Sequence, residues 1–360
     1  MGVAGPAGAQ GSDLSSLLPA GSRDRVAGIY ADLGIDNPMI DAIGAGAINP
    51  DDFVCGSTDF GNRIGQIFDA TNPAALDQLF FFGAHIWPEV YTVLFDNDPS
   101  DTEIGANGEH TREQVKRHKD NRRFWDADID DVQLHGMHGA DIADDAKMVP
   151  VVTWLLEVPP AIAQEIVDMI QELIETDPTV GYDHPVFSLN AFAVSFEGEE
   201  VFPGFGVIPD KIVMGDGLLQ MVTDIGLGGV GPDLIHAHEF GHHVQFEIGA
   251  FDTDITDPAE ATRRTELMAD AFAGYNLAHA RGASFQTKRI VDAVELSFNA
   301  GSCDFDSPGH HGTPNQRAAA ATWGADLAQR KGPRGKILSP ETLQELFDAA
   351  LPSIVAPDAG

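Results

Sequence analysis

The clearest periodic pattern in the chain lies between residues 161 and 174. Apolar residues recur there at the 3.6-residue spacing of one helix face, directly after the helix-start signal Pro159–Pro160. The members of this face are Ile162, Ile166, Met169, Ile170, Leu173 and Ile174. The pattern predicts an amphipathic helix that packs on a core.

The chain before this helix also has a mainly helical pattern, broken by Gly and Pro between residues 23 and 125. The apolar run 79–82 predicts a buried helix. Residues 110–123 are locally basic and predict a solvated helix that pairs with acidic neighbours, with a substrate-facing patch as the alternative. Residues 1–22 are rich in Gly, Ala and Ser and predict a flexible lead-in.

The pattern changes after the amphipathic helix. Residues 186–195 and 211–214 are short, apolar and rich in β-branched residues, which predicts strands. Helical patterns return from Asp233 onward. We therefore predict an α+β protein with a mainly helical N-terminal region of unassigned role at 23–150 and a mixed α+β catalytic region at 151–360.

The charge balance limits the partners. The chain has 56 acidic and 21 basic residues, for a net charge of -35, so it repels phosphate backbones and anionic lipids. We therefore expect neither nucleic acid nor a membrane surface as a partner. The acidity suits an extracellular or saline setting, but a genome that favours Asp, Ala and Gly explains it equally well.

Targeting signals give little support to a membrane location. The most apolar stretch, 79–95, is interrupted by His85, Pro88 and Glu89 and is shorter than the ~20 residues of a membrane span. The N-terminal residues lack the basic and apolar regions of an intact signal peptide, and could follow a removed one. We expect an extracellular or periplasmic protein.

Two cysteines occur in the chain, Cys55 and Cys303. They do not form a Cys-x-x-Cys pair, so a thiolate zinc site is not expected. One disulfide between them and two free thiols remain equally open.

A His-Glu-x-x-His motif occupies residues 238–242. On a helix, His238 and His242 lie one turn apart on the same face, so both imidazoles can bind one zinc ion. Glu239 lies beside the first histidine and can take a proton from a water on the open side of the ion. Apolar Leu234 and Phe240 predict a buried helix. The alternative is a helix whose histidines merely pack.

A catalytic zinc normally has three protein ligands and one open position. Downstream, Asp257–Glu260 has the sequence of a helix start with Asp257 as N-cap, and Glu266 and Asp270 follow one turn apart. We predict that Glu266 binds zinc and that Asp270 accepts a hydrogen bond from a ligating histidine. Two solvated carboxylates are the alternative, which the apolar neighbours Leu267, Met268, Ala271 and Phe272 disfavour.

Other histidines have weaker claims. His236 and His243 flank the motif, and we expect His243 to pack or to form a hydrogen bond. His135 and His138 lie in Leu-His-Gly-Met-His-Gly, where we expect a loop, with a second metal site as the minority alternative.

Two acidic segments suggest calcium as a possible addition to zinc. Asp126, Asp128 and Asp130 alternate as in calcium loops, but Asp131 and Met137 stand where an EF-hand needs Gly and Glu. The second segment contains Asp252, Asp254 and Asp257.

Several segments resemble known peptidases. Residues 238–245 resemble the signature of the bacterial neutral zinc metallopeptidase family, and 266–274 and 311–317 (His-Gly-Thr-Pro-Asn-Gln-Arg) fit the same family. Residues 190–193 and 212–218 resemble the segment before the zinc helix in HtpX-type peptidases. The resemblance covers roughly residues 186–330, and the chain lacks the membrane helices of HtpX-type enzymes.

The resemblance implies a gluzincin-like zincin fold, with a small mixed sheet over the zinc helix. It implies zinc ligands at His238, His242 and Glu266, and a general base at Glu239. His311, in the family-like segment, is a candidate donor to the oxyanion, although a structural hydrogen-bonding role is at least as well supported. His310 and Tyr275 are further candidates by residue type alone.

These observations predict a zinc-dependent endopeptidase with one zinc ion per chain and a peptide or protein substrate. Glu239 would take the proton of the attacking water and pass it to the leaving amine. One alternative is a zinc hydrolase of a small amide or ester, and another is a zinc-binding interaction protein without turnover. The N-terminal region could be a propeptide, a substrate domain or a partner module.

Overall fold

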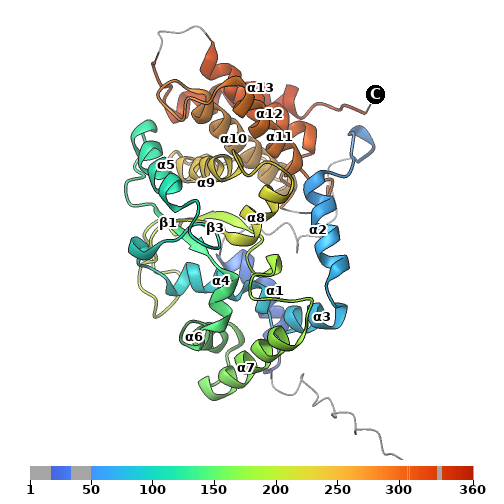
Figure 1. Cartoon of the computed structure of the whole chain (residues 1–360). Coiled ribbons are helices and arrows are strands. Elements are labelled where there is room, and N and C mark those ends of the chain that lie inside the picture. Colours follow the sequence, from blue (N-terminus) through green and yellow to red (C-terminus); the bar gives the residue numbers. More distant parts are fainter. Residues whose placement is uncertain (1–17, 34–49, 306, 308, 331–334, 360) are drawn as a thin grey trace, which may run out of the picture.

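The computed structural model describes residues 18–33, 50–305, 307, 309–330 and 335–359. A small three-stranded sheet lies between two groups of helices, with α9 to α13 on one side and α1, α4, α6 and α7 on the other (Figure 1). The protein is mostly helical with a mixed sheet, which confirms the predicted α+β class. Most of the predicted lead-in, residues 1–17, lies outside the described residues.

The sheet has the order β1-β3-β2. The central strand β3 (Lys211–Gly215) is buried throughout, pairs in parallel with β1 (Gln133–Met137) and pairs antiparallel with β2 (Ala191–Val194). Strands at 191–194 and 211–215 confirm part of the prediction, whereas residues 185–187 form a 3-10 turn. The expected loop around His135 is wrong, because residues 133–137 pair with β3.

The first half of the chain supplies the helices α1 to α7. Their bounds are α1 (Ser22–Leu33), α2 (Asp59–Ala70), α3 (Pro73–Phe81), α4 (Trp87–Val90), α5 (Thr111–Phe124), α6 (Asp145–Leu156) and α7 (Pro160–Thr176). A π-helical turn at Tyr91–Phe95 continues α4. The amphipathic helix predicted at 161–174 is α7, and its Ile166, Ile170 and Ile174 are buried as expected.

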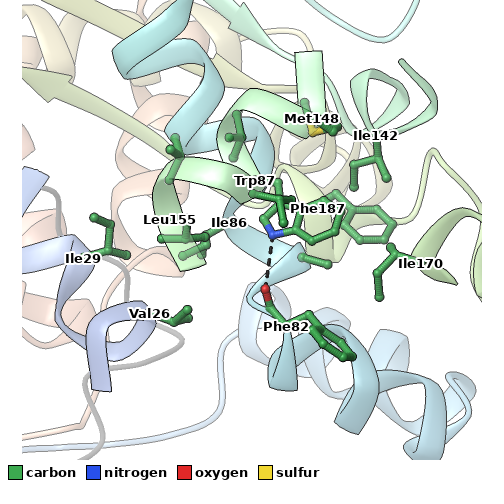
Figure 2. Close-up of a cluster of buried hydrophobic side chains, with 14 of the residues drawn as sticks. Val26, Ile29, Phe82, Ile86, Trp87, Ile142, Met148, Leu155, Ile170 and Phe187 are labelled. Carbon is green, nitrogen blue, oxygen red and sulfur yellow. Dashed lines mark hydrogen bonds between the residues drawn. The ribbon is translucent and has the colours of Figure 1, made fainter. Parts of the chain in front are cut away.

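The core of this half surrounds Trp87 (Figure 2). The indole of Trp87 is fully buried, and its Nε1 donates a hydrogen bond to the carbonyl of Phe82 at 3.2 Å. Ile142, Met148 and Phe187 lie around the same ring (Figure 2). A buried indole needs such an acceptor, because an unpaired N–H in an apolar core is costly.

The expectations for the helices at residues 79–82 and 110–123 are confirmed only in part. In the run 79–82, Leu79 and Phe82 are buried, but Phe80 is 38% exposed. The basic helix α5 does pair with acid, since Arg117 donates to Asp233 at 2.9 Å. Its inner face also packs on α9 through His118, a contact that the charge pattern did not indicate.

The second half consists mainly of helices around α9 and α10. Their bounds are α8 (Asp216–Asp224), α9 (Gly231–Glu247), α10 (Pro258–Ala278), α11 (Thr287–Asn299), α12 (Pro314–Gln329) and α13 (Pro340–Ile354). The predicted N-cap of α10 is confirmed, because the Asp257 side chain accepts a hydrogen bond from the Glu260 N–H. At the start of α12, Thr313 and Gln316 form a capping box.

Helices α10 and α12 approach closely at two glycines. A Cβ on Gly274 would lie 2.2 Å from the carbonyl oxygen of Ala321, and one on Gly324 would lie 1.9 Å from that of Ala271. Any side chain at either position would therefore separate the two helices. This contact involves the second half of α10 and the part of α12 beyond its first two turns, and it keeps the two helices close together.

The boundary expected between residues 150 and 151 falls inside α6. The core around Trp87 also contains Val194 and Val213, and the core beneath α9 and α10 contains Phe124 and Leu134. Both hydrophobic cores therefore draw residues from each side of that position.

No single helix in the described ranges has the length and apolar character needed to cross a membrane. Helices α6 and α7, bent by 115°, pass the same test only when taken together and only by length and composition.

A disulfide joins Cys55 to Cys303, across 248 residues of sequence. It resolves the choice between a disulfide and free thiols. It connects the segment before α2 to the loop between α11 and α12.

We expect removal of this disulfide by Cys55→Ser with Cys303→Ser to lower the free energy of unfolding by about 2–5 kcal/mol, because a long closed loop restricts the unfolded chain. Urea denaturation of both proteins at the same metal loading measures the difference. Equal unfolding midpoints would show that the crosslink does not stabilise the fold.

Candidate metal centre

Three side chains from two helices converge at one point. His238 and His242 project from α9, and Glu266 projects from α10. Their ligand atoms lie within 4.8 Å of one another, and all three residues are buried. Among the described residues, no other group of three or more His, Cys, Asp or Glu side chains brings its ligand atoms this close together. The group could hold a metal ion.

The distances within this group are nearly equal. His238 Nε2 lies 3.1 Å from His242 Nε2 and 3.2 Å from Glu266 Oε2. His242 Nε2 lies 3.2 Å from Glu266 Oε1. The three side chains thus present two imidazole nitrogens and one carboxylate toward a common point.

A chain of buried charges orients His238. Its Nδ1 donates to Asp270 Oδ1 at 3.1 Å, so Nε2 faces Glu266 and His242. Asp270 in turn accepts two hydrogen bonds from the Arg317 guanidinium, at 2.7 and 3.0 Å. Burial would raise the pKa of Asp270, but the charges of Arg317 and His238 and the hydrogen bonds from both side chains together outweigh burial and lower it. Asp270 therefore stays an anionic acceptor, as predicted.

The acidic neighbours of His238 raise its pKa. Burial lowers the pKa of His238, but hydrogen bonds to Asp270 and Glu266 outweigh burial and raise that pKa to about 10. Burial raises the pKa of Glu266, but the positive charges of His311 and His242 hold it well below the usual range. The two acidic side chains are thus ionised and favour a cation between the histidines.

A different residue orients His242. Its Nδ1 donates to Gln245 Oε1 at 3.0 Å, and the Gln245 amide donates to the carbonyl of Thr265 at 2.8 Å. Both histidines therefore have their Nδ1 engaged and their Nε2 directed at the common point. Such outer hydrogen bonds fix the tautomer and ring orientation of a metal ligand.

Glu239 lies beside the three-residue group but is not part of it. It is buried and lines the same cleft as His238 and His242. Burial raises its pKa above the usual value. A buried carboxyl group with a raised pKa is suited to exchange protons near neutral pH.

The site opens into a cleft of about 450 Å³. His311, Arg317 and Asp270 line it together with the metal group, and residues 189–193 around β2 form one wall. The remaining lining is largely apolar. The structure thus brings together all six residues singled out from the sequence: His238, Glu239, His242, Glu266, Asp270 and His311.

The flanking histidines face away from the ligand group. His243 Nε2 donates to the carbonyl of Lys211 on β3 at 2.9 Å, which confirms the hydrogen-bonding role expected for it. His236 forms hydrogen bonds with His118 and Asn121 at 3.2 Å. These contacts attach α9 to the sheet and to α5.

The other candidate metal-binding residues do not form such a cluster. His135 interacts with Asp96 and Gln133, whereas His138 pairs with Asp216 at 2.7 Å. Within the described residues, neither these histidines nor the acidic groups of 126–130 and 252–257 bring three ligand atoms together. No carboxylate cluster therefore supports the suggested second metal or calcium site.

Two residues of the site were missed at the sequence level. Gln245 could have been found, because it lies three residues after His242 on the same helix face. Arg317 lies 47 residues from Asp270, so no local spacing connects them. Its only signal was its place in the family-like segment 311–317.

We expect Arg317→Met to weaken metal binding by about 10–100-fold, because Asp270 loses the cation that keeps it in place beside His238. Competition with a chromophoric chelator measures the affinity. The matched control is Arg330→Met, which removes an exposed arginine at the end of the same helix. Equal affinities of Arg317→Met and wild type would show that this charge pair does not support the site.

In comparisons with known proteins, no family model, no curated protein and no solved structure matches this chain.

Proposed function

We propose that this chain is a zinc-dependent endopeptidase of the gluzincin-like zincin type. The observation that carries the proposal is the convergence of His238, His242 and Glu266 in a cleft that also contains Glu239. Two histidines and a glutamate, with one position left open, form a common ligand set of catalytic zinc.

The donor geometry supports zinc. Ligand atoms ~2.0–2.1 Å from a tetrahedral zinc ion lie about 3.3–3.4 Å apart. The three distances of 3.1, 3.2 and 3.2 Å among the donor atoms come close to that spacing. When bound, zinc supplies a Lewis acid that polarises the scissile carbonyl and lowers the pKa of a water molecule beside it.

Glu239 carries the proton transfers. Its carboxylate accepts the proton of the attacking water and returns it to the leaving amine, and the two steps together consume one water and split one amide bond. Its raised pKa suits both roles. His311 lines the same cleft and lowers the pKa of Glu266 through its charge, which supports it as the donor to the oxyanion.

The cleft suits an extended peptide. Strand β2 pairs with β3 along one edge, and in the described structure its other edge has no strand partner. Asn190, Ala191, Phe192 and Ala193 line the cleft along this strand. We infer that substrate backbone pairs with β2, as peptides do when they add a strand to a sheet edge.

The family and the location are parts of the same proposal. The segments 238–245, 266–274 and 311–317 supply the site residues, which supports kinship with the bacterial neutral zinc metallopeptidases. The Cys55–Cys303 disulfide fits an oxidising compartment, so we propose an extracellular or periplasmic location.

Incubation with peptide libraries, with and without a chelator, followed by mass spectrometry tests the proposal. We expect internal peptide bonds to be cut only in the zinc-loaded sample. Turnover of small amides or esters without any peptide cleavage would favour the zinc hydrolase. One zinc per chain without turnover of any substrate would favour a binding protein.

A further inference from the structure

A group of buried nitrogen atoms without hydrogen-bond partners lies between α10 and the segment that leads into α12. Among the described residues, no partner is found for Arg263 Nη1, for Gln316 Nε2 or for either ring nitrogen of His310. The three residues are at most 4% exposed. Buried N–H groups almost always have an acceptor, because leaving them unpaired is costly.

His310 lies over the first half of α10. Its ring centroid is 5.1 Å from that of Phe305, and Phe305 packs with Ala259. Ala259 precedes Arg263 by four residues, so both side chains lie on the same face of α10. Arg263 is also the charged residue with the largest effect on the pKa of His310. The His310 ring and the Arg263 guanidinium therefore share one interface.

Gln316 borders the same face of α10 one turn further along. A Cβ on Gly312 would lie 3.0 Å from Leu267 Cδ2 and 3.5 Å from Gln316 Oε1. Leu267 follows Arg263 by four residues, so it lies on the same helix face. The Gln316 Oε1 atom accepts from the Thr313 N–H at 3.1 Å. Its Nε2 remains as a free donor in this interface.

The interface is electropositive, although the whole chain is acidic. Burial, followed by the charges of Arg263 and His311, lowers the pKa of His310 to about 3. The backbone of Asp304 acts in the opposite direction but forms no hydrogen bond with the ring. His310 is therefore neutral and has one ring N–H to donate. Arg263 Nη2 pairs with Glu260, which leaves Nη1 to donate elsewhere.

We propose that Arg263, His310 and Gln316 form a buried binding site for one small monovalent anion such as chloride. An anion accepts hydrogen bonds from every side, whereas a water molecule must also place two protons of its own. A guanidinium, an amide and the His310 tautomer that turns its N–H inward therefore suit an anion. Because the three residues are buried, the site excludes large anions.

The anion site lies next to the metal centre. Arg263 precedes Glu266 by three residues on α10, and His310 directly precedes His311, which lines the cleft. A bound anion holds the segment with His311 against α10, so it should also favour cleavage. Anion binding itself does not depend on the proposed peptidase function, whereas this effect on cleavage does.

Thermal unfolding in sodium chloride and in sodium gluconate, at equal ionic strength and equal zinc content, tests the binding. We expect wild type to unfold at least about 2 °C higher in chloride, once chloride exceeds its dissociation constant about tenfold. Gluconate is too large for the site.

Two variants should lose this difference between chloride and gluconate. Gln316→Glu keeps the oxygen that accepts from Thr313 and places a carboxylate oxygen where Nε2 was, so it supplies the negative charge itself. His310→Phe keeps a ring beside Phe305 but removes both nitrogens. Arg112→Met is the control, because it removes an exposed arginine of α5 and should keep the wild-type difference.

Peptide cleavage measured in the same two salts tests the effect on the metal centre. We expect chloride to raise the wild-type rate by at least about fivefold over gluconate, and both variants to lose this response. Cleavage that is independent of chloride would overturn the effect on His311. Wild type that shows the thermal difference but cleaves no peptide would reject the peptidase and keep the anion site. The same thermal response to chloride in wild type, Gln316→Glu and His310→Phe, or none in wild type, would overturn the proposal.

Discussion

Glu239→Gln should lower peptide hydrolysis by about 10²–10⁴-fold while the protein still binds one zinc ion per chain. The substitution keeps the size of the side chain but removes the group that accepts the water proton. The ligand atoms of His238, His242 and Glu266 are untouched, so zinc content should not change. Initial rates on a fluorogenic peptide, together with metal analysis of the same sample, measure both quantities.

The control for this prediction is Glu247→Gln. It makes the same chemical change on the same helix, two turns further along, in a side chain outside the cleft lining. Its rate should equal that of wild type. If Glu239→Gln cleaves as fast as Glu247→Gln, Glu239 is not the general base.

Glu266→Ala should weaken zinc binding by more than about 100-fold, which exceeds the effect of losing an outer hydrogen bond. The variant removes one of three ligands and the anion that lies 3.2 Å from both His238 Nε2 and His242 Nε2. Hydrolysis should then disappear at stoichiometric zinc. Competition against a chelator of known affinity gives the dissociation constant.

Glu260→Ala provides the comparison for that variant. Glu260 lies at the start of the same helix, where it pairs with Arg263 and does not line the cleft. Its loss should leave zinc affinity unchanged. Wild-type zinc affinity in Glu266→Ala would place the third ligand elsewhere.

The residues of the metal group could be predicted from the sequence because they lie within short segments of two helices. His238, Glu239 and His242 lie within one helical turn, and Glu266 and Asp270 lie within one turn of a second helix. Helical spacing alone places His238 with His242 on one face of α9, and Glu266 with Asp270 on one face of α10. The start of α10 could be predicted for the same reason, since the Asp257 cap and its N–H donor are three residues apart.

Contacts between residues that are far apart in the sequence could not be predicted in this way. Strand β1 contains Gly136, where a Cβ would lie 1.9 Å from the carbonyl oxygen of Glu103. This close approach requires glycine, which weakened the strand pattern and suggested a loop. The strand forms because residues 211–215 pair with it. Arg317 and Phe60 likewise reach the cleft only through tertiary packing.

The most direct test of the account is zinc titration of the metal-free chain with peptide cleavage followed at each step. We expect no cleavage without metal, a rate that rises in proportion to bound zinc, and saturation at one ion per chain. A chain that binds no zinc, or that cleaves peptide at the same rate with and without it, would contradict the assignment of His238, His242 and Glu266 as a catalytic zinc site.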